Sequence, residues 1–381
     1  MKIPHEKFSL IYQAIIELLV GFVYVFNLES LKEFRVILFL IPALMSLRGA
    51  IYGVLALRIT TLLYLGKAKP SLKDALIRIE IFFSFLRSMF ASFILATLAF
   101  IFDKSFFEGA LSYGMLLTLS LLTNLLTFLI VAIPVSIAMF YYFKKGRVLE
   151  FIGTPFVSSF ADIVTPVILF LSIIPSFSII FQTFFLTFLL ILTATFLTIL
   201  YLRKSSREAY FSIFKFSEIR ENFYTISLMH TLYASISGFG GLFYARTLDL
   251  SQIQSLLVIV PAYNALLGSL GGILSSKVSV SLHLGTSNSL LKIFRDTILA
   301  YASFFAGITI VALFTNPIGI SIALIASFFT CIVISLISYY VSIAEFKKGF
   351  DPDTYTFPMI SSLGDLLAPA SVIIVTLVLI R

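Results

Sequence analysis

Long apolar segments alternate along this chain with short polar or charged ones. Each apolar segment holds about 20 residues with few charges, which is the length that a helix needs to cross the hydrocarbon core of a bilayer. The pattern therefore predicts an all-α integral membrane protein with about eleven transmembrane helices. The predicted helices lie near residues 8–27, 35–57, 79–102, 112–142, 155–175, 178–202, 223–245, 252–276, 291–314, 317–345 and 358–380.

Composition narrows the class of protein further. The chain is 59% hydrophobic and 12% charged, with a mean hydropathy of +1.05. A soluble domain does not need so many long apolar segments, so this composition favours a membrane protein. The formal net charge is +8, but the basic residues lie in short segments beside the predicted helices. The expected partner is therefore the lipid bilayer and not nucleic acid. The single cysteine, Cys331, excludes an intrachain disulfide and a metal site with several cysteines.

The 27 Lys and Arg residues predict the orientation of the helices. Most of them lie in segments that face the cytosol if the N-terminus is cytosolic. An odd number of helices then places the C-terminus outside, in a multi-pass protein of the cell membrane. We interpret segment 8–27 as a true first helix and not as a signal peptide, because it contains Glu17 and no small-residue cleavage site follows it.

A rare pattern around an aspartate occurs twice. In the first copy, Phe-Lys-Lys-Gly at 143–146 is followed by Pro155 and, seven residues later, by Asp162. The same residues recur 203 positions later, with the second aspartate at Asp365. A carboxylate inside a membrane helix is costly, so its repetition predicts a functional role in each half of the chain.

A second repeated motif joins a proline to a glycine. It runs from Pro42 to Gly49 and recurs 219 positions later, from Pro261 to Gly268. Each half then has five helices, with this motif on the second and the aspartate on the fifth. The helix at 178–202 belongs to neither half and makes the two repeats parallel, with a symmetry axis along the membrane normal.

The two motifs define the predicted domain organisation. A first five-helix repeat covers 1–175, a linker helix with a cytosolic loop covers 176–222, and a second five-helix repeat covers 223–381. We expect the repeats to form an internal pseudo-dimer that functions as one chain.

The residues around each aspartate suggest oxygen ligands for a cation. Ser158 lies one helical turn before Asp162, and Pro155 is placed in the first turn of the helix. Pro166 lies one turn after Asp162 and lacks the N–H that would bond the carbonyl of Asp162. The second copy repeats this arrangement at positions 358, 361, 365 and 369.

Oxygen ligands of this kind suit Mg2+ or Ca2+ better than zinc or copper. The alternative is a pair of structural aspartates in kinked helices. The predicted metal-site residues are Asp162, Asp365, Ser158 and Ser361.

Three further charges lie inside predicted helices. Glu17, Arg48 and Arg87 fall at a similar depth from the cytosolic ends of their helices. We predict a structural ion pair between Glu17 and one of the two arginines, and no transport role for them.

The motifs resemble those of a known family. Residues 42–66 resemble the second-helix signature of the MgtE magnesium transporters, and resemble more closely their eukaryotic solute-carrier relatives, which carry two such domains in one chain. The turn at 351–353, with Pro358 and Asp365, resembles the fifth-helix signature, and residues 155–162 its degenerate copy.

This resemblance implies a Mg2+ pathway between paired five-helix domains, lined by their second and fifth helices. The pore aspartate of the family then falls on Asp162 and Asp365. The family usually has Asn after the glycine of the second helix, where this chain has Ala50 and Ser269.

The predicted function is transport of a divalent cation, with Mg2+ as the favoured ion, by a transporter or a channel. A hydrated ion would lie between Asp162 and Asp365, and we expect no organic cofactor and no enzymatic activity. One alternative is an intramembrane aspartyl protease, which also needs two membrane aspartates. Residues 362–365 resemble part of its motif, but Asp162 is not preceded by tyrosine. Another alternative is a structural or lipid-handling membrane protein that transports nothing.

Overall fold

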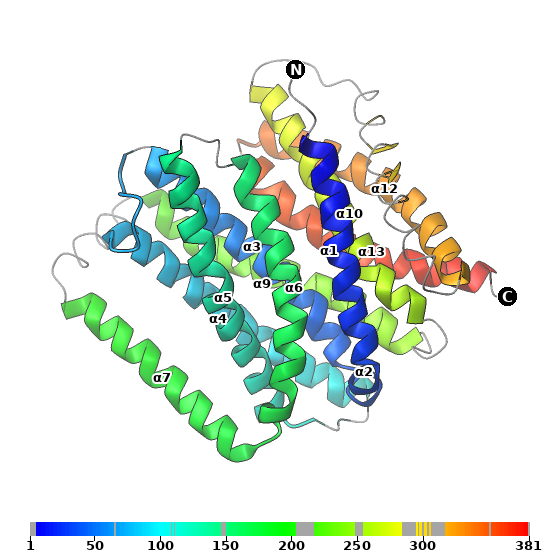
Figure 1. Cartoon of the computed structure of the whole chain (residues 1–381), viewed down its shortest axis with the longest axis horizontal. Helices are drawn as coiled ribbons and strands as arrows, with labels where there is room; N and C mark the ends of the chain where they lie inside the picture. Colours follow the sequence, from blue (N-terminus) through cyan, green and yellow to red (C-terminus); the bar gives the residue numbers. More distant parts are fainter. Residues whose placement is uncertain are drawn as a thin grey trace. The chain divides into compact units, whose positions relative to one another are not determined.

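In the computed structural model, the part of the chain that is described consists of helices and short connections, without a strand. The described residues are 5–64, 66–107, 109, 111–145, 150–202, 217–247, 254–283, 295, 297–298, 301–302, 305, 317–349 and 352–379. Their helices (Figure 1) are α1 (His5–Phe26), α2 (Leu28–Glu33), α3 (Ile37–Tyr64), α4 (Ala75–Phe106), α5 (Tyr113–Lys144), α6 (Glu150–Ser176), α7 (Ile179–Leu202), α9 (Ser217–Thr247), α10 (Gln254–His283), α12 (Pro317–Lys347) and α13 (Pro352–Leu379).

The all-helical fold predicted from the sequence is confirmed for these residues. The predicted helix at 291–314 lies mostly outside them. Four described helices, α4, α5, α12 and α13, contain segments long and apolar enough to cross a membrane. A fifth candidate is the pair α6 and α7, which are bent by 119° at the break between them. The total of eleven spans stays a prediction.

The starts of the two helices that carry the aspartates differ from the prediction. Pro155 and Pro358 were expected in the first turns of their helices, but α6 begins at Glu150 and α13 at Pro352. The segment 351–353 was interpreted as a turn, whereas Pro352 opens the helix. Proline suits the first helical position because its missing N–H would have no partner there. Asp162 and Asp365 therefore lie at the middle of their helices. They are further from the helix starts than they would be if the helices began at Pro155 and Pro358.

The helices group into two compact units. Unit 1 contains Met1–Ser46 and Tyr233–Arg381, and unit 2 contains Leu47–Leu232. The borders fall inside α3 and α9, so each of these helices contributes to both units. These borders differ from those of the predicted repeats. The repeats were inferred from duplicated sequence motifs, and their boundaries stay a prediction.

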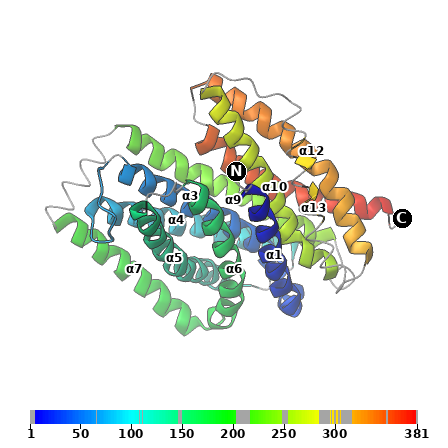
Figure 2. The ribbon, with the colours of Figure 1, turned by 45° about the horizontal axis from the view of Figure 1, so that its top comes forward.

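In unit 1, α10 packs against α1, α12 and α13 (Figures 1 and 2), and α12 also packs against α13. The contact of α1 with α10 joins a helix from the first half of the sequence to one from the second half. The backbones approach closely there, because a Cβ added at Gly21 would lie 2.0 Å from the carbonyl oxygen of Val258. Glycine at this position permits the packing.

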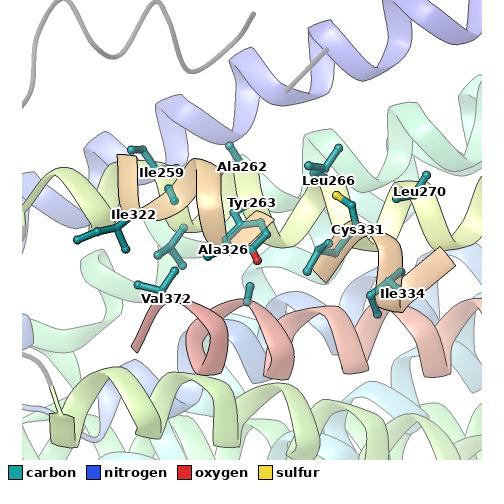
Figure 3. Packing of buried hydrophobic residues seen from close by; sticks show 14 of the residues in the cluster. Ile259, Ala262, Tyr263, Leu266, Leu270, Ile322, Ala326, Cys331, Ile334 and Val372 are labelled. Atoms are coloured by element: carbon teal, nitrogen blue, oxygen red, sulfur yellow. The ribbon is translucent and has the colours of Figure 1, made fainter. Parts of the chain in front are cut away.

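The core of unit 1 lies between α10, α12 and α13 (Figure 3). Tyr263 of α10 is fully buried among aliphatic side chains. Its hydroxyl shares hydrogen bonds with Thr330 of α12 and, at 2.8 Å, with Ser371 of α13. A buried hydroxyl needs such partners, so this tyrosine joins the three helices by polar as well as apolar contacts.

In unit 2, α5 packs against α4, α6 and α7. Ser120 of α5 donates a hydrogen bond of 3.0 Å to the carbonyl of Ser92 on α4, and both residues are buried. The N-termini of α4 and α5 are capped by Asp74 and Ser112, whose side chains accept from backbone N–H groups of the first turn.

Candidate cation site

Asp365 is partly buried at the middle of α13, within a segment apolar enough to cross a membrane. Its carboxylate accepts a hydrogen bond of 2.8 Å from the hydroxyl of Ser237, a fully buried residue of α9. A hydrogen bond from a neutral donor stabilises the charged form of the carboxylate without cancelling its charge. The sequence analysis did not identify Ser237, because no repeated motif includes it.

The backbone carbonyl of Asp365 faces the same helix. Pro369 removes the N–H that would bond this carbonyl within α13. Gly240 of α9 lies directly against it, since an added Cβ would be 2.1 Å from the carbonyl oxygen and 3.1 Å from Cγ of Pro369. Both oxygen-bearing groups of Asp365 are thus approached by α9.

The second-helix motif of the second repeat lies against the turn that precedes Asp365. A Cβ added at Gly268 of α10 would be 3.2 Å from the hydroxyl of Ser361. One added at Gly364 would be 3.0 Å from Cβ of Leu267. Small residues on both helices permit this approach, so the structure brings Gly268, Ser361 and Asp365 together on adjoining turns.

The beginning of α3 also reaches α13 within unit 1. The hydroxyl oxygens of Ser46 and Ser362 lie 3.4 Å apart, which is long for a hydrogen bond between hydroxyls. Ser46 lies one turn after Pro42, inside the repeated proline-glycine motif. Parts of both copies of that motif therefore contact the helix that carries Asp365.

An amide that the sequence analysis missed lies one turn before Gly268. Asn264 is partly buried, and its side-chain oxygen makes no hydrogen bond within the described part of the chain. Amide oxygens are ligands that Mg2+ and Ca2+ accept. Asn264 therefore places an available oxygen on α10, although the positions after the motif glycines are Ala50 and Ser269.

Asp162 lies in unit 2, partly buried at the middle of α6. The neighbouring Thr165 donates a hydrogen bond of 2.6 Å to the carbonyl of Ala161. Arg48 of α3 is 1% exposed and interacts electrostatically with Tyr52, one turn further along α3, and with the carboxylate of Asp162. The side chain of Ser158 lies outside the described part of the structure.

The predicted ion pair of Glu17 with an arginine joins residues of different units and stays a prediction. The electrostatic partnership of Arg48 with Asp162 was not expected. It left no signal in the sequence, because the two residues lie in different helices and only Asp162 belongs to the repeated pattern.

The interior of unit 2 around α5 is unusually polar. Thr123, Asn124 and Thr127 are fully buried, and their side-chain oxygens have no hydrogen-bond partner among the residues described. The ring of Phe128, the next residue, lies 6.0 Å from that of Tyr52. Buried polar groups of this kind are satisfied by water in folded proteins. The described residues contain no group of three His, Cys, Asp or Glu side chains that could hold a metal ion.

These observations define a class of protein: an all-helical chain with several helices that can cross a membrane, and with one carboxylate at the middle of each of two apolar helices. A family model described as the MgtE divalent cation transporter matches residues 41–172 and 260–375. The chain belongs to this family, which is one of magnesium and divalent cation transporters. A search of curated proteins and a search of solved structures gave no match.

The two matched segments follow the repeat found in the sequence. They begin 219 residues apart and end 203 residues apart, which are the offsets of the proline-glycine motif and of the aspartate motif. The resemblance proposed from the sequence is confirmed, and the match is consistent with a two-repeat form of the family.

Proposed function

We propose that this protein moves Mg2+ across the cell membrane along a path between its two repeats, with a hydrated ion held by Asp162 and Asp365. The observation that carries the proposal is the repeated carboxylate at the middle of an apolar helix. A buried carboxylate is costly there unless a cation or another partner offsets its charge. Membership of the family supports the same function.

The ligand chemistry favours Mg2+ with its water shell. Each repeat supplies one aspartate, and the groups near Asp365 are the hydroxyls of Ser237 and Ser361. Mg2+ loses its waters reluctantly and is commonly held by one or two carboxylates through retained waters. Two carboxylates from parallel repeats, at the same depth in the membrane, suit a hydrated ion between them. Ser158 is proposed to act in the first repeat as Ser361 acts in the second.

Ion flux into liposomes tests this function. The purified full chain is reconstituted with a Mg2+ indicator inside, and we expect uptake that exceeds that of protein-free liposomes. Ca2+ and Mn2+ in the same assay rank the ions. The absence of flux for all three would contradict transport, and cleavage of a membrane peptide by the same preparation would favour the aspartyl protease alternative. The family is one of transporters, so we expect no cleavage.

We further propose eleven spans, with a cytosolic N-terminus and an external C-terminus. The bias of Lys and Arg toward the segments predicted to be cytosolic supports this orientation. A reporter that functions only in the cytosol, fused after Arg381, should be inactive, and the same reporter fused before Met1 should be active. An active reporter at Arg381 would contradict either the orientation or the odd number of spans.

A further inference from the structure

The side chain of Arg48 is deeply buried within unit 2. Its side chain is 1% exposed, and all three guanidinium nitrogens lack a hydrogen-bond partner in the described part of the structure. A buried guanidinium is ordinarily retained only where hydrogen bonds and an opposite charge offset the loss of water. Its presence inside the protein therefore requires a compensating charge.

The carboxylate of Asp162 is placed to provide that charge. Arg48 and Asp162 belong to the same compact unit and interact electrostatically, although no hydrogen bond joins them. Tyr52, one turn along α3, also interacts electrostatically with the guanidinium.

The second repeat has no cation at the corresponding position. The offset of 219 that relates the two proline-glycine motifs pairs Arg48 with Leu267. Leu267 is fully buried and lies against Gly364, the residue before Asp365. The two repeats thus share the aspartate but differ in what the second helix presents near it: a fixed positive charge in the first repeat and an aliphatic side chain in the second.

We propose that Arg48 is the built-in counter-charge of Asp162, and that it determines how tightly the pathway holds a divalent cation. Arg48 offsets part of the attraction of Asp162 for the ion, so that the ion is bound and also released. This inference rests on the proposed function, because it assigns Arg48 a role in the same pathway.

The test uses the full chain in liposomes with the variants Asp162→Asn, Arg48→Leu, Arg48→Lys and the double variant Arg48→Leu/Asp162→Asn. Leucine is the residue that the second repeat has at this position. Asp162→Asn should reduce Mg2+ flux strongly, because it removes a charge that attracts the ion and also leaves a buried guanidinium uncompensated. The double variant should recover flux by at least about tenfold relative to Asp162→Asn alone.

Arg48→Leu alone should lower the Mg2+ concentration for half-maximal flux by about tenfold, because removing the positive counter-charge of Asp162 strengthens the attraction for a divalent ion. Arg48→Lys retains the charge, so its half-maximal concentration should remain closer to that of the wild type. A purely structural arginine would not move this concentration. If Arg48→Leu does not fold, Arg48→Gln, which is similar in size and neutral, replaces it in both measurements.

Two results would overturn the inference in a protein that transports Mg2+. One is a double variant no more active than Asp162→Asn, and the other is an unchanged half-maximal concentration in Arg48→Leu. Arg87→Leu/Asp162→Asn is the matched control, because Arg87 is also a buried arginine of unit 2. Equal rescue by this variant would also overturn the pairing. A wild-type protein without flux would refute the proposed function instead. The pairing would then be tested by melting temperatures: that of Arg48→Leu/Asp162→Asn should be higher than that of Asp162→Asn, and an equal or lower value would overturn the pairing.

Discussion

Replacing Asp365 by asparagine is expected to reduce Mg2+ flux by about 100-fold while the protein still folds. Asparagine keeps the shape of the side chain and one acceptor oxygen but removes the charge that attracts the ion. The interaction free energy between a charged group inside a membrane protein and a divalent ion is on the order of several kcal/mol. A loss of about 2.7 kcal/mol corresponds to a 100-fold change in flux. Asp162→Asn should also reduce flux sharply, and the double Asn variant should show the lowest flux of the three.

Ser237→Ala provides the matched comparison for this experiment. It removes the 2.8 Å hydrogen bond to the carboxylate of Asp365 but leaves the charge in place. We expect a loss of roughly tenfold, the size of one hydrogen bond to a charged group. Normal flux in the double Asn variant would exclude both aspartates from the pathway. A larger loss in Ser237→Ala than in Asp365→Asn would show that the serine acts independently of the carboxylate.

Gly241→Ala is expected to destabilise the protein by at least about 2 kcal/mol, through overpacking that no side-chain rotation can relieve. A Cβ added at Gly241 of α9 would lie 1.7 Å from the backbone carbonyl oxygen of Leu38 and 2.9 Å from Cγ of Pro42, both in α3. The two helices would have to separate. Thermal unfolding of the purified protein in detergent measures the effect, which should appear as a clearly lower melting temperature.

Gly114→Ala is the control for this substitution. Its added Cβ would meet the end of the Gln182 side chain, 2.5 Å from Oε1, and that side chain can rotate away. We therefore expect a change of less than about 1 kcal/mol, in either direction, because a helical alanine also has a better propensity than glycine. Equal melting temperatures for Gly241→Ala, Gly114→Ala and the wild type would contradict the close packing of α9 against α3.

The helices and the aspartates could be predicted from the sequence because both depend on local pattern. An apolar segment of membrane length forms a helix wherever it lies. The described helices α1, α4, α5, α7 and α12 begin and end within about four residues of the prediction, whereas α3, α6, α9, α10 and α13 each differ by more at one end. The motif at 42–66 and the residues around Asp365 likewise resemble signatures of the family to which the chain belongs. The start of α13 was missed because Asp-Pro is also a common turn signal.

The neighbours of the aspartates could not be predicted, because they come from other helices. Ser237 and Gly240 lie on α9, where no repeated pattern distinguishes them from other small residues. Glu17 was expected to pair with Arg48 or Arg87 because their depths are similar, and that pairing stays a prediction. Equal depth alone does not define which helices adjoin. Only the tertiary structure places Arg48 in one unit with Asp162.

The contact between α1 and α10 has a consequence for how this chain is made. A ribosome delivers helices to the membrane in order, so α1 enters the bilayer long before its packing partner exists. Until α10 is inserted, the face of α1 that contains Gly21 is covered by lipid or by another helix. The first half of the chain therefore lacks a complete fold of its own during synthesis. Because both halves belong to one chain, α10 reaches α1 at a high local concentration once it is inserted. This favours packing of α1 against α10 of the same molecule over packing against another molecule.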